Sequence, residues 1–246
     1  YLANEIATNT LNETITKILS QKSITNPHMM CAAFTNSGNS LQATQFEADI
    51  RVVEQLLDFK LGGGNPYAAD NLLWYFAAKH TRIDSFEKRG KKGILIGIGD
   101  EKCGGESNIL GSECLPNVFG DKFAGNIGFL DSYKMASEKY EVIHIEIGPD
   151  YRFQGNYGKH SVFHEWCEWL PGRVARLHAA NVVYMSDLIV TIIHMLQGTK
   201  REDALNMIED KKAREIVRSS VAYMYFEAAG ESQPPADKAS RIAIDV

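Results

Sequence analysis

The chain has 246 residues and a mass of 27.4 kDa, which suits one large α/β domain with additions better than two small domains. Its content of 44% hydrophobic and 23% charged residues is typical of a soluble globular protein with ample apolar side chains for a core. The net charge of -5 argues against a broad phosphate-binding surface, so we predict no nucleic-acid partner.

The cysteines and the hydropathy pattern bear on the compartment. Four cysteines are scattered without CxxC spacing, at positions 31, 103, 114 and 167, so we expect reduced thiols rather than a disulfide framework. We expect no apolar window as long as a transmembrane helix, and we identify no signal peptide. The sequence therefore predicts a cytoplasmic protein that does not contact a membrane.

Residues 62–101 form the most informative stretch. Three glycines, Gly62–Gly64, allow tight turning and close approach to a ligand. Asn65 suits a helix N-cap and Pro66 the first helical position, and the apolar residues that follow at helical spacing predict a helix.

A buried strand is predicted at residues 94–98, an apolar run bounded by glycines and covered on both faces of the sheet. It ends at Asp100 and Glu101. Ligands of open α/β sheets bind at the carboxyl ends of the strands, so these carboxylates and the glycine loop are the best candidate site.

The remaining elements alternate between strands and helices. The pattern favours strands at 29–34, 142–147 and within 174–184, and helices at 1–19, 46–57, 130–140, 161–170 and 186–198. Capping-box patterns precede the helix at 46–57, at Thr44–Glu47, and a charged surface helix, at Thr199–Glu202. Residues 102–126 read as a long surface loop with one helical turn.

This alternation predicts an α/β fold with a doubly wound, mostly parallel, Rossmann-like sheet. We place the α/β domain at residues 1–198, a charged C-terminal helix at 199–230 and a linker-like tail at 231–246. The tail ends in Arg241–Val246, which is apolar enough to dock on the fold.

The ordered set of segments MMCAAFTNSGN, QFEADIRVVEQLLDFKLGGGN, LLWYFAAKHT, EKRGKKGILIGIGDE and YEVIHIEIG resembles von Willebrand factor A-like (vWA) domains. It is most similar to the stand-alone intracellular type of bacteria and their phages. The resemblance covers residues 1–196 and implies a non-enzymatic protein-interaction domain, acting as an adaptor or assembly factor beside a protein partner such as an AAA+ ATPase or a phage assembly component.

The resemblance also implies a divalent cation, Mg²⁺ or Mn²⁺, at the carboxyl edge of the sheet. Asp100 matches the aspartate that follows the fourth strand of such domains. Asn65 lies in the loop that carries the family's threonine and is the substitute ligand that we predict. The Asp-x-Ser-x-Ser loop of the family is not in this sequence, a departure that puts cation binding in question.

Two other functions stay open. One is a Rossmann-like hydrolase or transferase that uses Asp100, Glu101 and Cys103, with Cys103 as a reactive thiol. The other is a structural subunit with a degenerate metal site, whose C-terminal helix and tail drive homo-oligomer formation. Asp100 and Glu101 also fit a plain solvated strand end.

Several site patterns are incomplete. The glycine triplet lacks the features of a P-loop or a dinucleotide-binding loop. His160 and His164 occur in HSVFHEWCE, which does not match the HExxH zinc motif. We interpret His144 as a hydrogen-bonded histidine of a strand, and Trp166 and Trp169 as packing residues.

Overall fold

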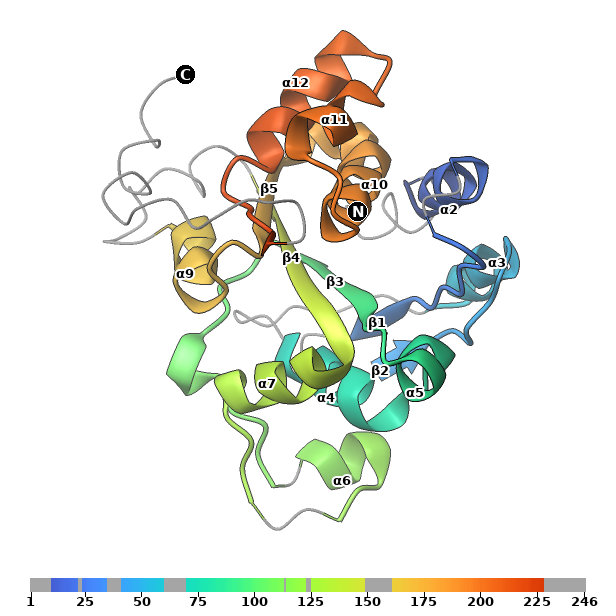
Figure 1. Cartoon of the computed structure of the whole chain (residues 1–246). Coiled ribbons are helices and arrows are strands. Elements are labelled where there is room, and N and C mark those ends of the chain that lie inside the picture. Colours follow the sequence, from blue (N-terminus) through green and yellow to red (C-terminus); the bar gives the residue numbers. More distant parts are fainter. Residues whose placement is uncertain are drawn as a thin grey trace. The chain divides into compact units, whose positions relative to one another are not determined.

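The protein is described by a computed structural model, and the described residues are 10–21, 24–34, 41–59, 70–112, 114–122, 125–148 and 161–227. They form a mixed α/β fold that falls into two compact units, Tyr1–Val142 and Ile143–Val246. Figure 1 labels the helices and strands of both units.

The strands belong to two sheets. A three-stranded parallel sheet has the order β3-β4-β5, with β3 at Gly93–Gly99, β4 at Tyr140–Gly148 and β5 at Val174–His178. A two-stranded antiparallel sheet joins β1, Ala32–Phe34, to β2, Leu41–Ala43. The α/β class with a parallel sheet is thus as predicted, and it is compatible with a Rossmann-like fold.

Helix α4, Asp70–His80, lies at the centre of the first unit and packs along α7, Phe129–Lys139. The ring of Trp74 lies 4.8 Å from that of Phe129 and 5.4 Å from that of Tyr133. Such tilted and edge-on contacts add to the free energy gained from burying the rings. Helix α4 is apolar on most of its circumference because it is buried nearly all round. The predicted helix in this region is confirmed, although its first turn lies outside the described residues.

The other helices of the first unit are α2 at Leu11–Ser20, α3 at Arg51–Leu57, α5 at Asp84–Arg89 and α6 at Cys114–Phe119, with a 3-10 turn, η2, at Gly105–Ser107. The helix predicted at 46–57 begins later than predicted, because residues 44–47 extend the antiparallel sheet instead of capping the helix. The hydroxyl of Thr44 accepts a hydrogen bond from the Cys31 amide, and Glu47 forms a bridge with Met29. The capping-box prediction at Thr44–Glu47 is therefore wrong.

The predicted loop at 102–126 contains more structure than one turn. Besides η2 and α6, it contributes an isolated bridge between Leu110 and Ile127. Leu110, Leu115 and Ile127 join Leu72 and Tyr75 of α4 in a buried apolar cluster. The segment is irregular in sequence, yet its Leu110 and Leu115 side chains belong to the core.

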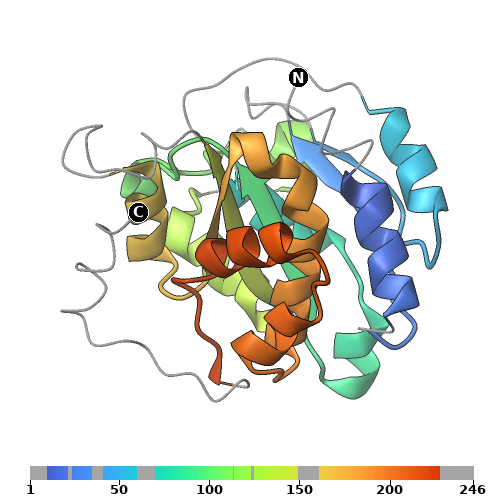
Figure 2. The same ribbon diagram turned by 90° about the horizontal axis from the view of Figure 1, so that it is seen from above.

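The second unit contains the rest of β4, β5, and the helices α9 at Val162–Trp169, α10 at Met185–Leu196, α11 at Arg201–Asn206 and α12 at Lys211–Ser220, with a 3-10 segment, η3, at Ala179–Tyr184. Strands β4 and β5 run parallel, with His144 opposite Val174 and Glu146 opposite Arg176. Helix α12 packs on β5 and α10, and α11 packs on α10, an arrangement that Figure 2 shows from above.

In place of the charged helix predicted at 199–230, the described residues contain two short helices, α11 and α12, separated at residues 207–210. The segment is not a free surface helix either, because its apolar side chains are buried, among them Ala204, Leu205, Ala213, Val217 and Val221. The capping box at Thr199–Glu202 does not form, since Lys200 precedes α11 and makes no side-chain capping bond. Burial of these apolar side chains, and not the local capping pattern, determines the structure of this region.

Among the described residues, one segment, 179–196, is long and apolar enough to cross a membrane by length and composition alone. The expectation that no window reaches this length is therefore wrong. The segment comprises η3 and α10, and 56% of it is buried within the fold, as in the core helix of a soluble protein.

Candidate functional site

The candidate site that the sequence predicts lies in the first unit, where β3 ends. Asp100 follows the last strand residue and is exposed, whereas Glu101 is half-buried. Gly62–Gly64 and Asn65 lie outside the described residues, so the structure does not place the second half of the predicted site.

Two asparagines join the start of α4 to the loop that follows β3. The side-chain amide of Asn71 donates to the side-chain oxygen of Asn108 at 2.7 Å. The amide of Asn108 in turn donates to the carbonyl oxygen of Cys103 at 2.7 Å. The oxygen of Asn71 accepts the backbone N–H of Leu72 at 2.9 Å. This chain of hydrogen bonds holds the loop of residues 100–108 beside the first turn of α4.

The two asparagines and Asp70 were missed by the sequence analysis. Asn71 is 2% exposed and Asp70 is 3% exposed, although polar side chains are seldom buried. The adjacent polar pair Asp70-Asn71 at the beginning of an apolar helix was the available signal. Its partner, Asn108, lies 37 residues away in an irregular segment, and no local pattern identifies it.

A resident divalent cation needs several oxygen ligands that converge on one point. In the described part of the chain, no group of three or more histidine, cysteine, aspartate or glutamate side chains is placed to hold a metal ion. Asp100 by itself supplies one such ligand. The ligand role of Asn65 stays a prediction.

The cysteines show little sign of reactivity. Cys103 has no exposed surface, so its thiol is not accessible to a substrate from solvent. All four cysteines are thiols, as expected. Burial raises the pKa of the Cys31 thiol to about 11 and that of the Cys167 thiol to about 12, which disfavours the nucleophilic thiolate at neutral pH.

The histidines that the sequence analysis discussed have structural partners. His144 in β4 is 1% exposed, stacks on the Trp166 ring at a centroid distance of 3.6 Å, and places its Nε2 atom 3.4 Å from a carboxylate oxygen of Glu146. The expectations of a partnered strand histidine and of a packing role for Trp166 are confirmed. The Nδ1 atom of His164 lies 2.6 Å from the hydroxyl of Ser161, which caps α9. His160 lies outside the described residues.

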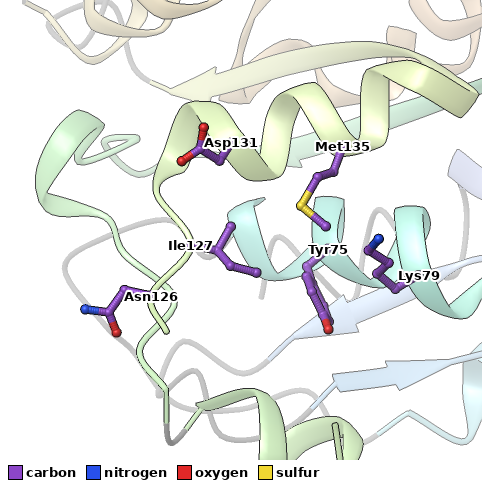
Figure 3. Close-up of a pocket in the computed structure, with 6 residues that line it drawn as sticks. All are labelled: Tyr75, Lys79, Asn126, Ile127, Asp131 and Met135. Atoms are coloured by element: carbon purple, nitrogen blue, oxygen red, sulfur yellow. The ribbon is translucent and has the colours of Figure 1, made fainter. Parts of the chain in front are cut away.

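A pocket of about 390 Å³ lies between α4 and α7. Figure 3 shows Met135 of α7 pointing toward Tyr75 of α4, and the pocket is also lined by Lys79, Asp131, Asn126 and Ile127. The Tyr75 hydroxyl donates to Asp121 at 2.7 Å, and the same carboxylate oxygen lies 2.7 Å from His80 Nε2.

These contacts limit the chemistry of the pocket. Burial, and then the hydrogen bond to Asp121, raise the pKa of Tyr75 to about 12, so this hydroxyl is neutral at physiological pH. The hydrogen bonds from Tyr75 and His80 lower the pKa of Asp121, so this carboxylate is charged and structurally engaged. The pocket joins one ammonium, one carboxylate and apolar walls, without a nucleophile activated by a neighbouring base.

Comparisons with protein-family models, curated proteins and solved structures gave no match to this chain.

Proposed function

We propose that the chain is a vWA-like protein-interaction domain, an adaptor or assembly factor. Its docking edge comprises the loop after β3, residues 100–109, and the loop that precedes α4. The partner is a protein, and we propose no catalysed reaction. The resemblance of the sequence supports this class, and the geometry of the loop after β3 supports the place.

The observation that carries the proposal is the fixed loop after β3. The hydrogen bonds from Asn71 to Asn108 and from Asn108 to Cys103 anchor this loop. Asp100 and Glu106 of the same loop are exposed, and the Ile109 side chain is 50% exposed. An ordered surface with an apolar contact and a charged rim suits the docking of a protein.

A divalent cation is the proposed bridge between this edge and an acidic side chain of the partner. Asp100 would supply one ligand and Asn65 another, with the partner's carboxylate completing the oxygen shell that Mg²⁺ or Mn²⁺ prefers. The resemblance further suggests an AAA+ ATPase or a bacterial or phage assembly component as the partner. The cation bridge and the class of partner are each more specific than the docking of a protein at this edge. Either of them can be wrong while the docking proposal holds.

The alternatives receive less support. A hydrolase or transferase would need an accessible nucleophile, and the Cys103 thiol is buried. A self-assembling subunit driven by the C-terminal helices would need an apolar face free for a second copy. The apolar side chains Ala213 and Val217 of α12 are buried, and the helix packs on β5 and α10 of the same unit.

Thermal melts with and without Mg²⁺ or Mn²⁺ test the cation bridge. A cation that binds only the folded chain adds about 2.7 kcal/mol of stability at a hundred times its dissociation constant, a shift that a melt resolves easily. We expect the shift in the unmodified chain and in Asp58→Ala, an exposed aspartate of the same unit, but not in Asp100→Ala or Asn65→Ala. An unchanged melting temperature at millimolar cation would contradict the cation bridge. Direct docking of the partner without a cation would then remain as the proposal.

A further inference from the structure

The pocket between α4 and α7 has the size and composition of a small-molecule site. Its volume of about 390 Å³ lies within the range of roughly 300–1,000 Å³ that such sites occupy. Small-molecule sites combine apolar walls with a few polar groups that fix the orientation of the ligand. Three apolar and three polar side chains line this pocket, and none of them belongs to the loop after β3: Tyr75, Ile127, Met135, Lys79, Asn126 and Asp131.

The apolar centre of the pocket is held in place by the fold. Tyr75 is 5% exposed, and its hydroxyl donates to Asp121 at 2.7 Å. Ile127 is also 5% exposed, and its backbone N–H donates to the carbonyl oxygen of Leu110 at 3.0 Å. Met135 is half-buried, and its unbranched side chain adapts readily to the shape of a ligand. A surface that is ordered beforehand binds without paying the entropy of ordering itself.

The two charged side chains of the pocket lie on opposite sides of this apolar centre. In Figure 3, Lys79 lies on one side of Met135 and Tyr75, and Asp131 lies on the other. On α4, Lys79 follows Tyr75 by four residues, or about 6 Å along the helix axis. Asp131 precedes Met135 by the same spacing on α7. The pocket therefore has a cationic end and an anionic end.

At the cationic end, the ammonium of Lys79 is available to a ligand. Lys79 has no hydrogen-bond or ion-pair partner among the described residues. Lys139 is engaged within the fold, because its Nζ atom donates to the carbonyl oxygens of Ala78 at 2.9 Å and Thr81 at 2.7 Å. Burial lowers the pKa of Lys139, and the positive charge of Lys79 lowers it to a smaller extent. An anionic group bound at Lys79 would relieve this repulsion.

At the anionic end, the carboxylate of Asp131 is the available acceptor. Asp131 is exposed, and in the part of the chain that the structure describes it has no hydrogen-bond or ion-pair partner. The side-chain oxygen of Asn126, by contrast, already accepts the backbone N–H of Ser112 at 3.2 Å. Carboxylates form their strongest hydrogen bonds with charged donors, so this end suits an ammonium group.

We propose that the pocket binds a free α-amino acid with an apolar side chain. Its carboxylate pairs with Lys79, its ammonium group pairs with Asp131, and its side chain packs on Met135 and the Tyr75 ring. A simple anion would be repelled by Asp131 and a simple cation by Lys79, whereas a wholly apolar ligand would desolvate both charges without pairing them. The proposal goes beyond protein docking at the loop after β3, and neither depends on the other.

Calorimetric titration of the unmodified chain with three related compounds tests the ligand class. The compounds are L-leucine, N-acetyl-L-leucine, which lacks the ammonium group, and L-leucinamide, which lacks the carboxylate. All three keep the same apolar side chain. We expect L-leucine to bind and each analogue to bind at least about tenfold more weakly, because each loses one charge-assisted hydrogen bond.

Variants of the two charged residues test the location. We expect Lys79→Met and Asp131→Asn each to weaken the binding of L-leucine at least about tenfold. Lys79→Met should also bind L-leucine and L-leucinamide equally, because the carboxylate then has no partner. Lys134→Met and Glu138→Gln remove the same charges from exposed positions of α7 outside the pocket, so they are the matched controls and should bind as the unmodified chain does.

Four results would overturn the proposal. If L-leucine, L-methionine and L-phenylalanine all fail to show saturable binding at millimolar concentration, the pocket does not take an amino acid. N-acetyl-L-leucine that binds as tightly as L-leucine would make the ligand a simple anion, and L-leucinamide that does so would make it a simple cation. An unchanged affinity for L-leucine in Lys79→Met and Asp131→Asn would place the bound amino acid elsewhere on the chain.

Discussion

Small networks of polar side chains connect distant segments of this protein, and each contains one buried member, Asn71 or Tyr75. Asn71 and Asn108 fix the loop after β3, and Tyr75 and His80 share the carboxylate of Asp121. A buried polar group that loses its partner costs about 1–3 kcal/mol, so such pairs position their loops strongly. The free energy of unfolding should be sensitive to each of them.

The Tyr75 hydroxyl gives a pH-dependent signature. Its pKa is raised from 10.0 to about 12 in the folded state, so the folded chain holds this proton more tightly than the unfolded chain. The resulting stability is fully present below pH 10 and is lost as the pH rises to about 12. We expect Tyr75→Phe to lower the free energy of unfolding by about 1 kcal/mol at pH 7 and to flatten its decline above pH 10.

Urea unfolding measured at several pH values checks this prediction. Tyr133→Phe, on the adjacent helix α7, is the control and should keep the alkaline decline. A decline of the same size in Tyr75→Phe and in the unmodified chain would contradict the assignment to Tyr75.

Gly172 gives a second prediction for a single residue. It has a φ of +72°, in the left-handed region that side chains disfavour, and a Cβ atom placed on it would overlap the ring of Tyr225. We expect Gly172→Ala to destabilise the chain by about 2–4 kcal/mol through backbone strain and overlap. Gly111→Ala, where a Cβ meets nothing within 4 Å, should change the melting temperature little. Equal effects in the two melts would argue against this packing of Tyr225.

At the scale of elements, helices α11 and α12 belong to the core of the second unit. Leu205 has no exposed surface, whereas Met207, two residues later, is 48% exposed. We expect Leu205→Ala to cost about 2–5 kcal/mol, because it leaves a cavity, and Met207→Ala to cost well under 1 kcal/mol. Chemical denaturation of both variants measures the difference. Similar small losses would instead indicate a loosely attached surface helix.

The elements that the sequence predicted well have strong local patterns. The apolar run at 94–98, the alternation at 142–147 and the Ser161-capped helix each agree with a strand or helix of the structure. Both capping boxes failed, because pairing of Glu47 with Met29 and burial of the α11 stripe overrode the local signal. Residues 102–126 were hard to predict because their order comes from contacts with α4 rather than from periodicity.

The candidate site was predictable only in part, for a related physical reason. Asp100 could be placed because it directly follows a strong strand signal. The Asn71–Asn108 contact joins residues 37 positions apart, and no single-sequence pattern encodes such a pair. The prediction of a fully buried strand at β3 was also wrong, because most of its residues are half-buried. An apolar run has the same sequence pattern whether or not both neighbouring strands are present.

For the whole molecule, we propose that the loop after β3 is a protein-docking edge. The chain would then work by presenting an ordered acidic surface with one apolar contact, on a fold whose second unit supplies stability through its own core. Substitutions at this edge should change partner binding while leaving the fold intact. Circular dichroism melts of each variant provide that check.

The most direct measurement is quantitative capture from an extract of the cells that express the protein. The immobilised unmodified chain, Asp100→Ala, Ile109→Asp and the control Asp58→Ala are compared by mass spectrometry. We predict one protein enriched on the unmodified chain and on Asp58→Ala, at least about tenfold reduced on Asp100→Ala and Ile109→Asp, a loss of about 1.4 kcal/mol or more. Equal enrichment on all four chains, with every variant folded, would contradict docking at this edge.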